Sequence, residues 1–143
     1  MKDKQALMES SLERAAEIVG DLTGPVMERY YAGFPQARQM FEEHGCGSRE
    51  RLEISMVETV LYCAMYWIER PAEIEILLGS SVPHHQETLH IDLESYCGLV
   101  DALVDVIALT IPAERADEQA LWTDIRHSLL SQIKQSRSQY VDA

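Results

Sequence analysis

Apolar residues recur at helical spacing along nearly the whole chain, and this pattern limits the fold more than any other feature. Between Arg49 and Glu69 they form two adjacent stripes, one at positions 54, 57, 61, 65 and 68 and another at 52, 56, 60, 64 and 67. A helix that is apolar over so much of its circumference belongs in the middle of a core. No segment alternates strictly between apolar and polar residues, as a half-buried strand would. The sequence therefore predicts an all-α protein.

Prolines, glycines and capping residues divide the chain into six to eight expected helices. The periodic patterns predict helices, including one short turn, over about 4–20, 25–34, 35–41, 49–69, 93–110 and 113–137. Thr23, Ser48 and Asp92 are the expected caps, and 43–48 is the clearest loop. The stretch 72–78 is expected to be a short helix that Gly79 to Pro83 interrupts, which leaves the following histidines only weakly helical.

Length and charge narrow the range of functions. The 143 residues suit one domain, 1–143, with a continuous core. Twelve basic residues oppose 24 acidic ones, so the formal net charge is -12. Phosphate backbones and anionic membrane surfaces repel such a chain, which argues against nucleic acid or a membrane as partners.

The cysteines and the N-terminal residues indicate the compartment. Cys46, Cys63 and Cys97 are odd in number and lack CxxC spacing. We interpret them as buried thiols in a reducing environment. The first residues lead into an amphipathic pattern rather than an apolar run, so neither a secretion signal nor a membrane span is expected. A cytoplasmic protein is the prediction.

Three histidines, His84, His85 and His90, lie just before the most apolar helix. From the residues alone, they are either exposed side chains of a polar loop or ligands of a metal. Their spacing matches no usual zinc pattern, and no cysteine lies nearby in the sequence.

Two segments carry a resemblance to animal globins. His85-Gln-Glu-Thr-Leu-His-Ile-Asp-Leu-Glu-Ser-Tyr96 resembles the proximal haem segment, in which a ligating histidine precedes Leu-His-Val/Ile-Asp and then Glu and an aromatic residue. Phe34-Pro35 resembles the globin corner in which an aromatic–proline pair precedes, by six residues, a phenylalanine packed on the haem; here that residue is Phe41. The resemblance covers roughly residues 5–135 and implies a globin-like fold.

The resemblance also implies a cofactor and its site. The cofactor is haem b, with His85 as the iron ligand. Met56 follows Phe41 by 15 residues and precedes His85 by 29, which places it at the distal position. The other residues expected around the haem are Met27, Phe41, Val60, Ile91, Tyr96 and Leu99.

Two assignments stay open. A shift of one residue would make His84 the iron ligand, although the match at 89–92 favours His85. A shorter register would place Glu53 at the distal position and Val57 above the iron. The chain also departs from the family at Ser81, where globins usually carry leucine, and at Pro83 close to the ligand.

The expected function is reversible binding of O2, NO or CO. Because Met27 and Met56 offer no strong hydrogen-bond donor, we expect CO or NO to be favoured and oxygen to leave quickly. Alternatively, the Met56 thioether binds the iron and gives a six-coordinate resting state. An NO dioxygenase or peroxidase-like side activity would need a separate reductase. The acidic surface and apolar helices suit a monomer or a helix-packed homodimer equally.

Two rival classes share the fold. One is a non-haem globin-fold module that acts through protein contacts. The features that favour it are Ser81, Pro83 and the two methionines. The other is a haem-based gas sensor that signals through a separate partner.

Overall fold

The computed structural model describes residues 3–141, and within that range every regular element is a helix. The prediction of an all-α protein with six to eight helices is confirmed. The seven helices are α1 (Lys4–Val19), α2 (Thr23–Gly33), α3 (Ala37–His44), α4 (Arg49–Tyr66), α5 (Pro71–Glu87), α6 (Leu93–Leu109) and α7 (Ala116–Gln135).

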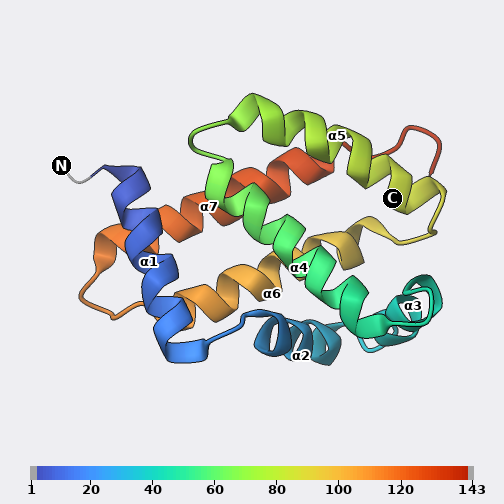
Figure 1. Ribbon diagram of the computed structural model, residues 1–143. Coiled ribbons are helices and arrows are strands. Elements are labelled where there is room, and N and C mark those ends of the chain that lie inside the picture. Colours follow the sequence, from blue (N-terminus) through green and yellow to red (C-terminus); the bar gives the residue numbers. More distant parts are fainter. Residues whose placement is uncertain (1–2, 142–143) are drawn as a thin grey trace.

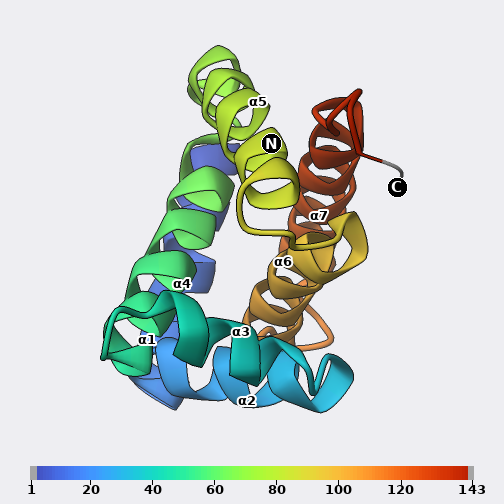
Figure 2. The same cartoon turned by 90° about the vertical axis from the view of Figure 1, so that its right-hand side faces the viewer.

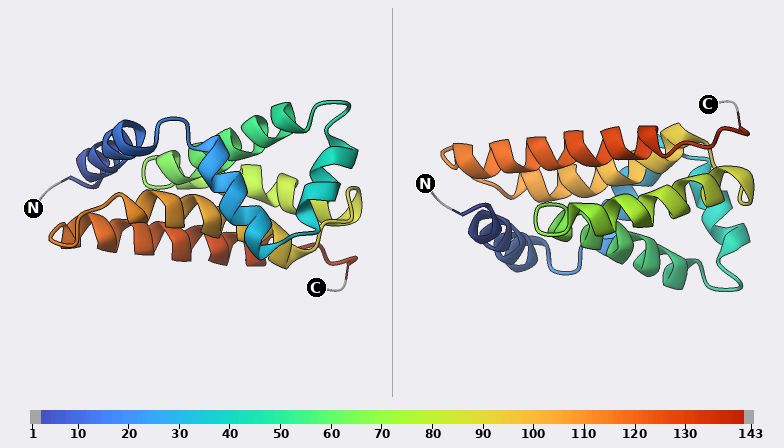
Figure 3. Two further views of the ribbon diagram at one scale, coloured as in Figure 1. Left: turned by 90° about the horizontal axis from the view of Figure 1, so that it is seen from below. Right: turned by 90° about the horizontal axis from the view of Figure 1, so that it is seen from above.

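Helix α6 lies at the centre of the packing, in contact with α1, α2, α4, α5 and α7. Its apolar run makes this possible, because Val100, Leu103, Val104 and Ile107 are all buried. Seen from the side, α6 and α7 stand opposite α4 and α5, while α2 and α3 close the lower end (Figure 2). Figure 3 shows α6 and α7 running side by side, with α2 crossing this pair obliquely.

The crossing of α2 and α6 depends on a glycine. Gly98 is buried on α6, and a β-carbon there would lie only 2.3 Å from Cε2 of Phe34. The absence of a side chain lets the aromatic ring rest against the α6 backbone. This contact brings the end of α2 to the helix that carries Tyr96 and Leu99.

A buried carboxylate joins the two ends of the chain. Glu118 on α7 is fully buried, and both of its oxygens accept hydrogen bonds from Arg14 on α1, at 2.7 and 3.0 Å. Ser11 donates a third bond at 2.6 Å. The Arg14 guanidinium, chiefly through these bonds, lowers the pKa of the Glu118 carboxyl below its usual value. The carboxylate therefore stays charged although its side chain is buried.

Two of the three expected caps are confirmed. Ser48 Oγ accepts a bond from the Arg51 amide at 3.3 Å, and Asp92 Oδ1 accepts one from the Ser95 amide at 3.1 Å. The prediction for Thr23 is wrong, because α2 already begins at Thr23 and Asp21 accepts a bond from its amide instead.

The predicted interruption at Gly79 to Pro83 is wrong, since α5 runs unbroken through it. Ile74, Leu78 and Val82 are buried at a spacing of four residues, so their packing outweighs the weak helix propensity. Pro83 removes only the hydrogen bond to the Gly79 carbonyl, and exposed Gly79 leaves that carbonyl open to water.

Other expectations change in detail. Helix α3 extends to His44, which shortens the predicted loop at 43–48.

Cys63 is buried and Cys97 half-buried, whereas Cys46 is exposed, so the interpretation of all three as buried thiols is wrong for Cys46. Within residues 3–141, none of the helices combines the length and the apolar character that a membrane crossing requires.

Candidate functional site

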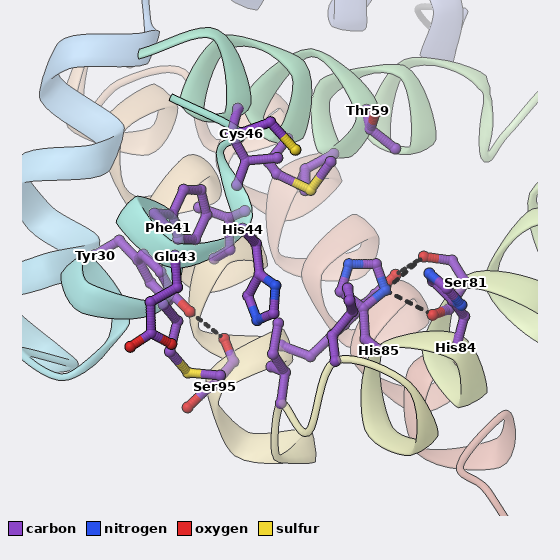
Figure 4. Close-up of a pocket in the computed structure, with 18 residues that line it drawn as sticks. Tyr30, Phe41, Glu43, His44, Cys46, Thr59, Ser81, His84, His85 and Ser95 are labelled. Atoms are coloured by element: carbon purple, nitrogen blue, oxygen red, sulfur yellow. Dashed lines mark hydrogen bonds between the residues drawn. The ribbon is translucent and has the colours of Figure 1, made fainter. Parts of the chain in front are cut away.

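A largely apolar cavity of about 570 Å³ opens among α2, α3, α4, α5 and the start of α6. This volume falls within the roughly 300–1,000 Å³ typical of sites for small molecules and cofactors. His44 reaches into it from α3 and His85 from α5 (Figure 4). The lining residues are Tyr30, Met40, Phe41, Glu43, His44, Cys46, Leu52, Met56, Thr59, Val60, Ser81, His84, His85, Leu89, Ile91, Ser95, Tyr96 and Leu99.

His85 is half-buried in the last turn of α5, and its protonation state follows from its surroundings. The Nδ1 atom lies 2.7 Å from the Ser81 carbonyl oxygen. A carbonyl oxygen can only accept, so Nδ1 carries the proton and Nε2 keeps its lone pair. Burial lowers the pKa of the imidazole below its ordinary value, which favours the neutral ring. A neutral imidazole with a free Nε2 is the form that binds a metal.

Tyr96 and Ser81 complete the surroundings of His85. The Tyr96 ring stands edge-on to the imidazole, with centroids 5.0 Å apart and an interplanar angle of 85°. Its hydroxyl lies 2.8 Å from Ser81 Oγ. Burial raises the pKa of the Tyr96 phenol to about 12, so the hydroxyl keeps its proton at neutral pH.

The two neighbouring histidines are in different environments. His84 also lines the cavity, but its side chain is exposed. Among the described residues, only His85 of this pair has a ring nitrogen held by a hydrogen bond. Its orientation and tautomer make His85 the better candidate ligand.

The end of α5 is tied down by a segment that the sequence did not identify. The Ser138 amide donates to Oε1 of buried Gln86 at 2.7 Å, and Ser138 Oγ donates to Glu87 at 2.6 Å. The chain after α7 thus packs against the turn that carries His85. No periodic signal marks residues 136–141, and this contact joins positions about 50 residues apart.

Most of the residues expected at the site come together around this cavity. The expected ones that line it are Phe41, Met56, Val60, His85, Ile91, Tyr96 and Leu99. Met27 is buried in the core but does not line the cavity; Tyr30, one turn later on α2, does. Leu52 was missed, although it lies on the same helical stripe as Met56 and Val60.

The alternative distal register places its residues elsewhere. Glu53 accepts a hydrogen bond from the Tyr31 hydroxyl at 2.7 Å and lies 3.5 Å from Arg49, and it does not line the cavity. Val57 is buried outside the cavity as well. Met56 and Val60 are therefore the α4 residues that face the cavity at these positions.

The number of protein side chains that could bind a metal limits which metal ion or metal-containing cofactor this cavity could hold. Within residues 3–141, no cluster of three or more His, Cys, Asp or Glu side chains could hold a metal ion. A bare zinc ion needs three or four protein ligands, whereas haem brings its own four nitrogens and needs one imidazole. The neutral, oriented His85 imidazole at this largely apolar cavity meets that requirement of haem.

Comparison with known proteins indicates neither a family nor a function for the chain. No family model, curated protein or solved structure matches the chain. The functional argument therefore depends on the geometry of the cavity.

Proposed function

We propose that this chain is a haem-binding globin that binds a diatomic gas reversibly. The observation that carries the proposal is the neutral His85 imidazole, whose Nδ1 is committed to the Ser81 carbonyl at 2.7 Å while Nε2 stays free beside an apolar cavity. When bound, haem supplies an iron centre that takes up O2, NO or CO. His85 would hold the iron through Nε2.

The helix order supports the same proposal. A short helix carrying Phe41 is followed by α4 with Met56 and Val60, then α5 with His85, and then the antiparallel pair α6 and α7. This is the order that the resemblance to globins implies. Phe41, Val60, Ile91 and Leu99 come from four different segments and would enclose the porphyrin.

Helices α2 and α4 present few free hydrogen-bond donors to the cavity. Met56 and Val60 present apolar groups from α4, and the Thr59 hydroxyl already donates to the Ser55 carbonyl at 2.8 Å. The Tyr30 hydroxyl donates to the Ser95 carbonyl at 2.9 Å and is equally committed. These α2 and α4 residues favour CO and NO over oxygen, because oxygen gains most from a donor. His44 of α3 lines the same cavity and carries a ring nitrogen that can donate.

Two of the observations cited for a module without haem, Ser81 and Pro83, lose their weight. Ser81 uses its backbone carbonyl to orient His85, which a leucine would do equally well. Pro83 lies inside a continuous helix and does not displace the histidine that follows it. The haem-binding function is therefore favoured over the non-haem alternative.

The test is a titration of the purified, haem-free protein with haemin. We expect one equivalent to bind and to give the intense Soret band of a histidine-ligated haem. His85→Ala should abolish that band, whereas the matched change one residue away, His84→Ala, should preserve it. Absence of a Soret band, or its survival unchanged in His85→Ala, would contradict the proposal.

A further inference from the structure

The imidazole of His85 faces two oxygens of the same residue. The Ser81 carbonyl oxygen lies 2.7 Å from Nδ1, and Ser81 Oγ lies 3.4 Å from it. The carbonyl can only accept a hydrogen, whereas the hydroxyl can either accept or donate. The carbonyl thus favours a proton on Nδ1, and a donating hydroxyl would favour the other tautomer, with the proton on Nε2.

The Ser81 hydroxyl has a second neighbour, the Tyr96 hydroxyl, and either of the two oxygens can be the donor. Tyr96 Oη lies 2.8 Å from Ser81 Oγ, a shorter separation than the 3.4 Å to Nδ1. A serine hydroxyl has one hydrogen to give. If that hydrogen goes to Tyr96, the lone pairs of Ser81 Oγ face Nδ1, and both oxygens of Ser81 favour the same tautomer.

Tyr96 is well placed to accept the Ser81 hydrogen, because hydrogen bonds on two sides hold the first turn of α6 in position. The Ser95 amide donates to Asp92 at 3.1 Å, and the Ser95 carbonyl accepts from the Tyr30 hydroxyl at 2.9 Å. The Ile91 amide, in addition, donates to the His85 carbonyl at 2.9 Å and ties this turn to the end of α5. The Tyr96 hydroxyl therefore has a defined position relative to Ser81.

We propose that Tyr96 is a positioning residue for His85: by accepting the single hydroxyl hydrogen of Ser81, it keeps the proton of His85 on Nδ1 and leaves Nε2 free to bind a metal. The inference rests on the proposed role of His85 as a ligand. Removal of the Tyr96 hydroxyl releases the Ser81 hydrogen, which then donates to Nδ1 and stabilises the wrong tautomer.

The experiment measures the His85 tautomer ratio by ¹⁵N NMR in the haem-free, full-length protein. At about pH 8, above the ordinary pKa of histidine, the ring is neutral and the two nitrogens are distinguishable. In Tyr96→Phe we expect the ratio of the Nδ1–H to the Nε2–H form to fall about fivefold, the effect of gaining one competing hydrogen bond. Tyr31→Phe, which removes the bond to Glu53 outside the cavity, is the matched control.

A second variant separates this role from a general loosening of the site. Ser81→Ala keeps the backbone carbonyl and removes the competing hydroxyl, so its ratio should stay near that of the wild type. Tyr96→Phe in the Ser81→Ala background should then have no effect, because no hydroxyl hydrogen is left to release. An unchanged ratio in Tyr96→Phe, or the same fall in both backgrounds, would overturn the proposal.

This readout is independent of the haem titration. A wild-type protein that binds no haem would contradict the proposed function, while the tautomer ratios would still decide the role of Tyr96. Conversely, haem binding with unaltered ratios would leave the proposed function in place and remove the positioning role. In the haem-loaded protein, Tyr96→Phe should weaken haem affinity only by the factor by which the fraction of the Nδ1–H form falls, because only that form offers Nε2.

Discussion

The surroundings of His85 determine more of its chemistry than its residue type does. A histidine can be charged or neutral and can carry its proton on either nitrogen. The Ser81 carbonyl selects the Nδ1–H form, and burial selects the neutral ring. Together these leave one lone pair, on Nε2, for a metal.

Substitution of Met56 should change the rate at which oxygen dissociates. In the haem-loaded protein, Met56→Gln should slow oxygen dissociation about tenfold, because the new amide can donate a hydrogen bond worth about 1–1.5 kcal/mol to the gas. Stopped-flow measurement of the dissociation rate checks this. Met56→Leu keeps the side chain apolar at similar volume and should leave the rate close to that of the wild type. A rate in Met56→Gln equal to that of Met56→Leu would show that position 56 does not face the gas.

At the scale of single residues, the sequence could predict which side chains meet, but only in part what they do there. Periodicity and the globin resemblance predicted that Phe41, Val60 and His85 surround one site, and all three line one cavity. In the sequence, Ser81 was notable only because globins usually carry leucine there. Its hydrogen bond to His85 uses the backbone carbonyl, which every residue type has, so the residue type could not predict it. The pairing of its hydroxyl with Tyr96 needed the actual crossing of α5 and α6.

Among the helices, α5 shows how tertiary packing corrects an expectation from local sequence. Gly79 and Pro83 are weak helix formers, and the sequence predicted a break between them. Burial of Ile74, Leu78 and Val82 along one face holds the helix together. Continuity of α5 matters for the site, since the bond from His85 to Ser81 is a contact across one helical turn.

Two glycines in helices should respond oppositely to alanine. Gly98→Ala places a methyl group 2.3 Å from a Phe34 ring atom and should destabilise the protein by about 1–3 kcal/mol through overpacking of the α2–α6 crossing. Gly79→Ala meets no atom within 4 Å and should stabilise α5 by about 0.5–1 kcal/mol. Urea denaturation of the two variants measures both effects. Equal stabilisation by both changes would mean that Phe34 does not lie against α6.

For the molecule as a whole, periodicity predicted the class and most of the helices, while contacts between distant segments lay beyond it. The α1–α7 link depends on Glu118, which in the sequence is one acidic residue among 24. The return of Ser138 to Gln86 is equally invisible, because neither residue belongs to an apolar pattern. Polar contacts of this kind depend on the final position of each helix. The spacing of buried apolar residues, by contrast, can be read from each segment of the sequence by itself.

Replacement of the proposed ligand tests the central claim, that the His85 imidazole binds haem iron in this cavity. His85→Gly removes the side chain and leaves room for a free imidazole molecule in its place. We expect the haemin-treated variant to lose the histidine-ligated spectrum and to regain it when imidazole is added, with saturation as the cavity fills. A His85→Gly protein that shows the wild-type spectrum without added imidazole would contradict the claim.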